Sequence, residues 1–179
     1  MACSVYAAQY LLEGLFEHGA GAQALALITA PTDRSWRYML QSGTTITWEA
    51  WDQQYKPNQD WNHAWGAAPA NLLPRFVLGA RPLAPGWRRA RVRPETGALT
   101  RASGTVPTPR GPIQVRWTNH GRFSLTLALP EGMSAQVELP AHEGSTGVFT
   151  GGVPVEARRV GSHWRLAGDV SGAVTLEVR

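Results

Sequence analysis

The hydrophobic period of the chain changes near Gly86, and this change limits the available folds more than any other feature of the sequence. Before Gly86, apolar side chains recur every three or four positions, as on one face of a helix. After it they recur at about every second position, as on one face of a strand. Helices followed by strands, rather than alternating with them, predict an α+β protein. We therefore expect a helical region over residues 1–85 and a β domain over residues 86–179.

Four segments of the first region show helical spacing. The expected helices cover Ser4 to His18, Gly21 to Ala30, a third segment capped by Thr32 or Asp33, and Trp61 to Leu78 capped by Asp60. A further short helix is expected to begin within Trp48 to Trp51. The connection between the first two helices is very short, so they should lie antiparallel. So few helices are expected to leave apolar surface uncovered.

The second region reads as a series of short strands separated by turn residues. The expected strands cover Arg88 to Arg93, Gly97 to Val106, Gly111 to Thr118, Arg122 to Leu129, Met133 to Leu139, Gly147 to Phe149, Val153 to Val160, His163 to Leu166 and Gly172 to Val178. The proline-rich segment Arg81 to Gly86 is expected to be a linker. Short strands at regular spacing predict an antiparallel β-sandwich.

The composition is that of a folded chain, with 43% apolar and 17% charged residues. No apolar run is long enough to suggest a membrane span, and Val5 to Phe16 has no basic leader. We therefore expect no membrane partner and no signal peptide, and the sequence leaves the compartment open. The net charge of +4 comes mainly from scattered arginines. The group Arg88 to Arg93 is interpreted as a strand with one solvated face, so we expect no nucleic-acid partner.

No pattern in the sequence suggests a bound metal ion or a phosphate-bearing cofactor. The five histidines have no ligand-like spacing, and Cys3 is the only cysteine. Gly19 and Gly21 do not follow a predicted strand, so they do not form a phosphate-binding loop. We therefore expect no metal and no cofactor.

The densest group of candidate functional residues lies within residues 43–66, which hold four of the chain's eight tryptophans. Indole rings that frame a few polar groups are typical of sugar-binding clefts. Here Glu49 lies between Trp48 and Trp51, and His63 follows a loop. We expect the two indoles to contact a sugar. The same residues also suit structural roles, with the indoles in the core and the histidine near a helix start.

Four motifs in this chain follow one another in the order known from one protein family. They are TTITWEAWD from Thr44, WNHAWGAAPANLLPRFVLGARPLAPGW from Trp61, RVRP from Arg91, and GTVPTPRGPIQVRW from Gly104. In this order they resemble the C-terminal part of bacterial α-L-rhamnosidases, which are inverting glycoside hydrolases. The resemblance implies the last helical hairpins of an (α/α)6 barrel, of the six-hairpin glycosidase type, followed by an antiparallel β-sandwich. It extends from the first helix to about Leu139.

The resemblance also implies roles for two residues. The glutamate of the Trp-Glu segment, here Glu49, would be the general base, and the histidine of the Asn-His pair, here His63, would contact the sugar. Inverting glycosidases use two carboxyl groups roughly 6.5–9.5 Å apart. Burial between Trp48 and Trp51 is expected to raise the pKa of the Glu49 carboxyl.

The family's general acid lies well upstream, in a part of the barrel that we expect to be missing from this chain. We therefore expect the C-terminal fragment of an α-L-rhamnosidase-like hydrolase that acts on rhamnose-containing glycosides and is inactive alone. One alternative is a non-catalytic carbohydrate-binding or accessory module. Another is an interaction module whose uncovered helical surface docks on the missing part of the barrel or on a second copy.

Overall fold

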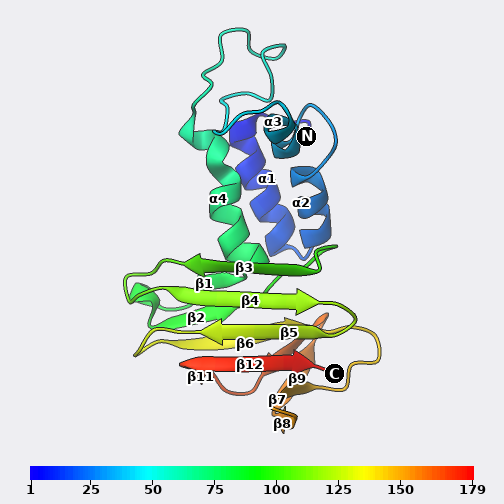
Figure 1. The fold of residues 1–179 in the computed structure, drawn as a ribbon, viewed down its shortest axis with the longest axis vertical. Helices are drawn as coiled ribbons and strands as arrows, with labels where there is room; N and C mark the ends of the chain where they lie inside the picture. Colours follow the sequence, from blue (N-terminus) through cyan, green and yellow to red (C-terminus); the bar gives the residue numbers. More distant parts are fainter. The chain divides into compact units, whose positions relative to one another are not determined.

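The computed structural model describes residues 1–179 and divides them into two compact units, Met1–Leu72 and Leu73–Arg179 (Figure 1). The first unit is helical and the second consists mostly of strands. This confirms the expected α+β class. The domain boundary expected between residues 85 and 86 stays a prediction. The two compact units meet at a different place, between Leu72 and Leu73.

The first unit contains a helical hairpin and shorter helical pieces. Its elements are α1 (Val5–Glu17), α2 (Gly21–Ile28), α3 (Trp36–Gln41), η1 (Ala64–Ala67) and α4 (Ala68–Leu72). The side chain of Ser4 caps α1 by accepting a hydrogen bond from the Ala7 N–H at 3.1 Å. Helices α1 and α2 lie side by side, as expected for a short connection (Figure 1). The buried face of α1 consists of Val5, Ala8, Leu12 and Phe16.

Two of the expected helix starts are wrong. The residue that caps α3 is Ser35, whose Oγ accepts from the Tyr38 N–H at 3.1 Å and donates to the Ala30 carbonyl at 2.7 Å. The buried Ser35 is therefore the N-cap of α3, in place of Thr32 or Asp33, which were expected from the sequence. The fourth helix starts at Ala64 rather than Trp61, and His63 occupies its cap position in place of Asp60.

The fourth helical segment changes its winding twice. It begins as the 3₁₀ turn η1, continues as α4 and ends as the π-helical turn η2 (Leu73–Val77). Pro69 is the second residue of α4, and Pro74 lies within the π turn. A proline inside a helix removes a backbone donor, which is consistent with the change of winding at Pro74. No helix forms within Trp48 to Trp51, where the backbone is irregular.

The second unit contains two sheets. Its elements are β1 (Ala80–Pro82), η3 (Pro85–Trp87), β2 (Arg89–Val92), β3 (Arg101–Val106), β4 (Ile113–Asn119), β5 (Phe123–Ala128), β6 (Ser134–Pro140), β7 (Val148–Thr150), β8 (Val153–Val155), β9 (Ala157–Val160), β10 (His163–Leu166), β11 (Val170–Ser171) and β12 (Ala173–Val178). One sheet has the order β1-β2-β6-β10-β9, with β11 also paired to β6. The other has the order β3-β4-β5-β12-β7-β8. All pairs are antiparallel except β2 with β6.

The segment expected to be a linker begins inside strand β1, which pairs with β2. Gly79 makes this possible, because it adopts a φ of +81° and a Cβ there would lie 2.2 Å from the Arg93 carbonyl carbon. The Arg93 N–H donates to the Gly79 carbonyl at 3.0 Å. The proline content suggested a linker. Strand β1 lies at the edge of its sheet, and an edge strand tolerates Pro82 because the backbone N–H that proline lacks need not bond to a neighbouring strand.

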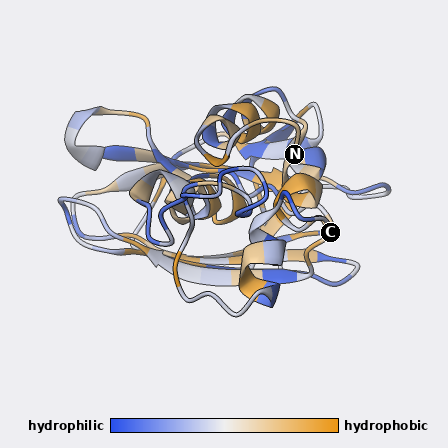
Figure 2. Ribbon diagram, turned by 90° about the horizontal axis from the view of Figure 1, so that it is seen from above, coloured by the Kyte–Doolittle hydropathy of each residue, from blue (hydrophilic) through white to orange (hydrophobic).

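The core of the second unit follows the predicted alternation. The buried apolar residues of its strands include Ala90, Val92, Ile113, Val115, Trp117, Phe123, Leu125, Leu127, Ala135, Val137, Leu139, Leu166, Leu176 and Val178. Figure 2 shows hydrophobic and hydrophilic residues side by side within the same strands. The indole N–H of Trp117, which is 1% exposed, donates to the Val77 carbonyl at 2.8 Å, so the ring carries no unpaired donor into the core.

A cluster of charged side chains lies within the first sheet rather than on a solvated face. Glu138 is 2% exposed and accepts from Arg91 at 3.1 Å and from Arg165 at 3.2 Å. Burial alone would raise the pKa of the Glu138 carboxyl, but Arg91, Arg165 and Arg93 outweigh this and hold it below its ordinary value. The solvated face expected for Arg88 to Arg93 is therefore wrong for Arg91 and Arg93, which pair with buried carboxylates.

His163 lies at the edge of this charged cluster and is buried as a neutral ring. Burial and the neighbouring Arg93 guanidinium lower its pKa from 6.5 to about 4. The Arg93 Nε–H donates to the His163 Nε2 at 3.4 Å, which requires an unprotonated nitrogen. Glu95 lies 3.9 Å from the same nitrogen, and burial raises the pKa of its carboxyl.

His163 predicts a loss of stability in acid. Its pKa is lower in the folded chain than in the unfolded chain, so the unfolded state binds more protons below pH 6.5. We expect this group to remove up to about 3 kcal/mol of the unfolding free energy between pH 6.5 and pH 4. Denaturant titrations followed through the β-sheet circular dichroism signal should show this slope in the native protein. The slope should flatten in His163→Gln but not in His120→Gln, which alters an exposed turn; equal slopes in all three proteins would contradict the assignment.

Candidate active site

Two chain segments of the first unit come together and position the candidate residues. The Glu49 N–H donates to the Asp60 carbonyl at 3.0 Å, and the His63 N–H donates to the Thr47 carbonyl at 2.9 Å. The Thr47 hydroxyl donates in return to the His63 carbonyl at 3.2 Å. Glu49 and His63 therefore lie on neighbouring segments, although fourteen positions of mostly irregular loop separate them in sequence.

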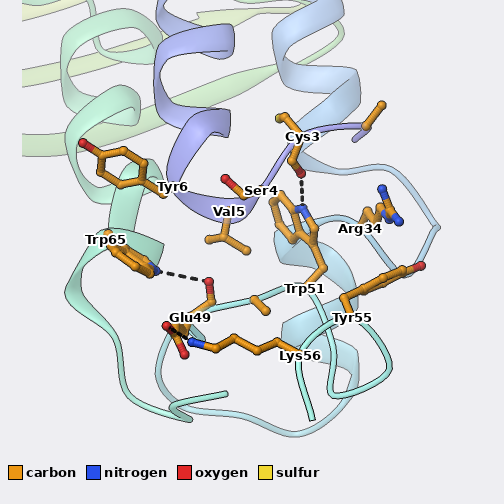
Figure 3. A pocket seen from close by; sticks show the side chains of 12 residues that line it. Cys3, Ser4, Val5, Tyr6, Arg34, Glu49, Trp51, Tyr55, Lys56 and Trp65 are labelled. Carbon is orange, nitrogen blue, oxygen red and sulfur yellow. Dashed lines mark hydrogen bonds and ion pairs between the residues drawn. The ribbon is translucent and has the colours of Figure 1, made fainter. Parts of the chain in front are cut away.

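The Glu49 carboxylate is held through both of its oxygens. The Lys56 ammonium forms an ion pair with Oε1 (Figure 3). The Asp60 backbone N–H donates to Oε2 at 3.0 Å. The Glu49 side chain is only 10% exposed, whereas that of Lys56 is 40% exposed. Lys56 is the only lysine of the chain, a signal that could have been read from the sequence.

These contacts overturn the expectation that burial raises the pKa of Glu49. The hydrogen bond from Lys56 and that from the Asp60 N–H lower the pKa below the ordinary value for glutamate. Desolvation acts in the opposite direction but is smaller than these bonds. Glu49 is therefore an ionised carboxylate at neutral pH, able to accept a proton but not to donate one.

His63 is stacked beside the carboxylate segment. Its ring lies 4.0 Å from that of Trp65 at an angle of 19°, and the Trp65 indole N–H donates to the Glu49 backbone carbonyl at 3.1 Å. The Nδ1 atom of His63 is buried and has no hydrogen-bond partner in the protein. A buried polar atom without a partner is costly, and this nitrogen is closed off from solvent in the present arrangement.

Trp48 and Trp51 are largely buried, with 5% and 3% exposure. The indole N–H of Trp48 donates to the Thr44 hydroxyl at 3.0 Å, and that of Trp51 donates to the Cys3 carbonyl at 2.7 Å. The Trp51 ring also packs edge-on against Trp36, with centroids 5.0 Å apart. Sugar contact by these two rings stays a prediction, and their packing makes them supports for the segment that carries Glu49.

A more open pair of indoles flanks the same region. Trp61 is 48% exposed and Trp65 is 40% exposed. Trp61 packs edge-on against Trp48 with centroids 4.9 Å apart, and Trp65 lies 5.3 Å from the Tyr6 ring. Density of tryptophan in the sequence identified the region, but it did not tell buried rings from exposed ones.

The Glu49 carboxylate lies in the wall of an open cavity of about 570 Å³ in the first unit (Figure 3). The cavity is lined by Ala2, Cys3, Ser4, Val5, Tyr6, Arg34, Glu49, Ala50, Trp51, Tyr55, Lys56 and Trp65. Glu49 supplies the only carboxyl group of this lining. The Arg34 guanidinium stacks over the Tyr55 ring at 4.1 Å, so aromatic and basic groups share the wall.

No group of three or more histidine, cysteine or acidic side chains is arranged to hold a metal ion. None of the helices has the length and apolar character needed to cross a membrane. The first unit thus carries an ionised carboxylate in an open, aromatic-lined cavity, and a β-sandwich follows it in the chain.

Comparison with known families places the chain more narrowly. Residues 2–77 match the bacterial alpha-L-rhamnosidase 6 hairpin glycosidase domain. Residues 79–153 match the bacterial alpha-L-rhamnosidase C-terminal domain. The chain thus belongs to the bacterial α-L-rhamnosidase family.

Individual relatives agree with this assignment. The chain is 31% identical over 141 residues to an alpha-L-rhamnosidase of Alteromonas sp. (strain LOR), covering 74% of this chain and 15% of that protein. It is 30% identical over 140 residues to an alpha-L-rhamnosidase of Streptomyces avermitilis, covering 73% of this chain and 14% of that protein. The chain therefore spans a small part of the length of these relatives.

Solved structures share the fold. The alpha-L-rhamnosidase from Dictyoglumus thermophilum superposes with a TM-score of 0.86 at 21% identity, covering 98% of this chain and 21% of that one. The Streptomyces avermitilis alpha-L-rhamnosidase complexed with L-rhamnose gives a TM-score of 0.80 at 26% identity, covering 96% of this chain and 17% of that one. The expected hairpin region followed by a β-sandwich is confirmed.

The packing of the indoles predicts unequal costs of truncation. Trp51→Ala removes a buried ring and leaves the Cys3 carbonyl without its donor, so we expect a loss of about 3–5 kcal/mol in the unfolding free energy. Trp61→Ala removes a half-exposed ring and should cost roughly 1 kcal/mol. Urea denaturation followed at 222 nm would measure both. A loss for Trp51→Ala no greater than that for Trp61→Ala would rule out a supporting role.

Proposed function

We propose that this chain forms the C-terminal part of an α-L-rhamnosidase, in which Glu49 is the general base for inverting hydrolysis of terminal α-L-rhamnosides. The observation that carries this proposal is the ionised Glu49 carboxylate in the wall of an aromatic-lined cavity, within a chain of this family. His63, whose ring stacks on Trp65 beside the Glu49 segment, contacts the sugar. A rhamnose-containing glycoside is the ligand, in keeping with the Streptomyces avermitilis relative whose structure is complexed with L-rhamnose.

The reaction requires two carboxyl groups that act on opposite sides of the sugar. Glu49 accepts a proton from a water molecule as the water oxygen bonds to the anomeric carbon and the glycosidic C–O bond breaks. A carboxylic acid on the other side gives its proton to the departing oxygen. Since Glu49 is the only carboxyl group that lines the cavity, the general acid belongs to another part of the barrel.

The ionisation state of Glu49 suits the base and not the acid. A general acid must hold its proton near the working pH, which calls for a raised pKa. The pKa of Glu49 is lowered by Lys56 and the Asp60 N–H. A lowered pKa makes the carboxylate a weaker base but ensures that it is deprotonated over a wide pH range.

The proposal is tested by replacing Glu49 in a protein that joins this chain to the missing N-terminal part of the six-hairpin domain. Glu49→Gln removes the proton acceptor at nearly constant shape, so kcat on an aryl α-L-rhamnoside should fall by about 10²–10⁴-fold while KM changes little. The matched control is Glu131→Gln, which alters an exposed turn of the second unit and should keep full activity. Undiminished kcat in Glu49→Gln would reject the base assignment.

The same assay on the 179-residue chain alone tests whether this chain lacks the general acid. We expect no turnover of the aryl rhamnoside by residues 1–179 alone, because leaving-group protonation is missing. Turnover that is lost in Glu49→Gln would show that the chain supplies its own acid.

A non-catalytic carbohydrate-binding module is the second candidate, and the sandwich offers it a weaker site. A cavity of about 400 Å³ lies over β3, β4 and β5 and is lined by Ser103, Gly104, Thr105, Gln114, Val115, Arg116, Thr126 and Ala128. No aromatic ring lines it, so it lacks a stacking surface for a sugar. The cavity beside Glu49 therefore supports the enzymatic proposal better.

A further inference from the structure

We propose that Lys56 is a positioning residue that fixes the Glu49 carboxylate and keeps it ionised for its role as general base. The inference rests on the proposed function, because it describes how the base is prepared. It starts from the ion pair between the Lys56 ammonium and Oε1 of Glu49, at a side chain that is 10% exposed. The Lys56 side chain is 40% exposed, so solvent screens the pair from the lysine side, and only the carboxylate end is shielded from water.

The carboxylate is oriented by two different donors. Lys56 binds Oε1 and the Asp60 N–H binds Oε2, so rotation of the carboxylate plane would break at least one of the two bonds. Each carboxylate oxygen has two lone pairs, and one donor on each leaves room for a water molecule. The arrangement therefore restrains the base without blocking it.

The loop that carries Lys56 is itself anchored, so the ammonium is delivered to a defined place. The Lys56 carbonyl accepts from the Gln59 N–H at 3.0 Å. The Gln59 side chain, 5% exposed, accepts from the Ala50 N–H at 3.2 Å, directly after Glu49. At the start of the loop, Asp52 accepts from the Tyr38 hydroxyl at 2.8 Å. The loop is thus fastened at both ends around the ion pair.

The choice of lysine is unusual in this chain. Lys56 is the only lysine, and all other members of the Lys and Arg set are arginines. The ion pairs of the second unit use arginine or histidine as the cation. Arg89, for example, binds both oxygens of Asp169, at 2.7 and 3.0 Å. A guanidinium at position 56 would tend to occupy both oxygens of Glu49 in the same way, whereas an ammonium acts as a point charge on one oxygen. A lysine therefore leaves Oε2 to the Asp60 N–H.

The first test is the titration of the Glu49 carboxyl by carbon-13 NMR in the 179-residue chain. Lys56→Met should raise the pKa of Glu49 relative to the native chain, and Lys56→Arg, which keeps the charge, should leave it low. Arg37→Met removes an exposed cation from the same helical unit and serves as the matched control, with no change expected. An unchanged titration in Lys56→Met would overturn the inference.

The second test is the pH profile of kcat/KM for an aryl α-L-rhamnoside, in the protein that joins this chain to the missing N-terminal part of the six-hairpin domain. Lys56→Met should move the acid limb of the profile to higher pH, whereas Lys56→Arg should leave the acid limb where it is in the native protein. In Lys56→Met, KM at neutral pH should change less than kcat. If Glu49→Gln abolishes turnover while Lys56→Met leaves the profile in place, the proposed function stands and the role of Lys56 is wrong. If Glu49→Gln leaves turnover intact, the proposed function itself fails, whatever the titration shows.

Chemical modification covers the case in which Lys56→Met does not fold. Lys56 carries the only side-chain amine, so acetylation of the folded protein removes its charge and reductive methylation retains it. In the carbon-13 titration of the 179-residue chain, acetylation should raise the pKa of Glu49 and methylation should not. Lys56→Arg, in which only the N-terminal amine can react, should respond to neither reagent. Equal titrations after both treatments would contradict the inference.

Discussion

The candidate site depends on the backbone pairing of the Glu49 segment with the Asp60 segment. The Glu49 N–H bonds to the Asp60 carbonyl, and the Asp60 N–H bonds to the Glu49 carboxylate. Irregular backbone must find partners for its N–H and C=O groups, and here those partners also aim a functional side chain. The loop between the two segments then returns Lys56 to the carboxylate. Without this pairing, Glu49 and His63 would lie on separate parts of a loop.

The surrounding indoles stabilise the pairing of the Glu49 and Asp60 segments. Trp51 ties the segment after Glu49 to the start of α1 through the Cys3 carbonyl, and Trp36 donates to the Gly66 carbonyl at 2.7 Å, beyond His63. The rings bury apolar area while each N–H is used once, as buried indoles require. The tryptophans that first suggest sugar stacking thus include several that hold the site together. The exposed rings of Trp61 and Trp65 are the ones open to solvent.

Sequence patterns predicted much of the fold, because periodicity and turn residues are local. Ile113, Val115 and Trp117 alternate and are buried, and all nine expected strands have counterparts in the structure, although Val153 to Val160 is split in two. The Ser4 cap was predictable for the same reason. Features that depend on distant residues were not. The cap at Ser35 competes with nearby Thr32 and Asp33, and the partial burial of Arg91 follows from its pairing with the buried Glu138.

The candidate site shows the same division between local and tertiary information. The motif order pointed to Glu49 and His63, but the direction of the Glu49 pKa depends on Lys56 and the Asp60 N–H, which only the folded loop brings near. Likewise, the neighbours of Trp48 and Trp51 in sequence do not reveal that their N–H groups are already used.

A crystal structure of the protein with L-rhamnose would test most directly whether Glu49 is the base. The sugar is expected in the cavity between Tyr6 and Lys56, with a water molecule between its anomeric carbon and the Glu49 carboxylate. A rhamnose bound along β3, β4 and β5, or a cavity sugar with no water or anomeric carbon near Glu49, would contradict the proposed role.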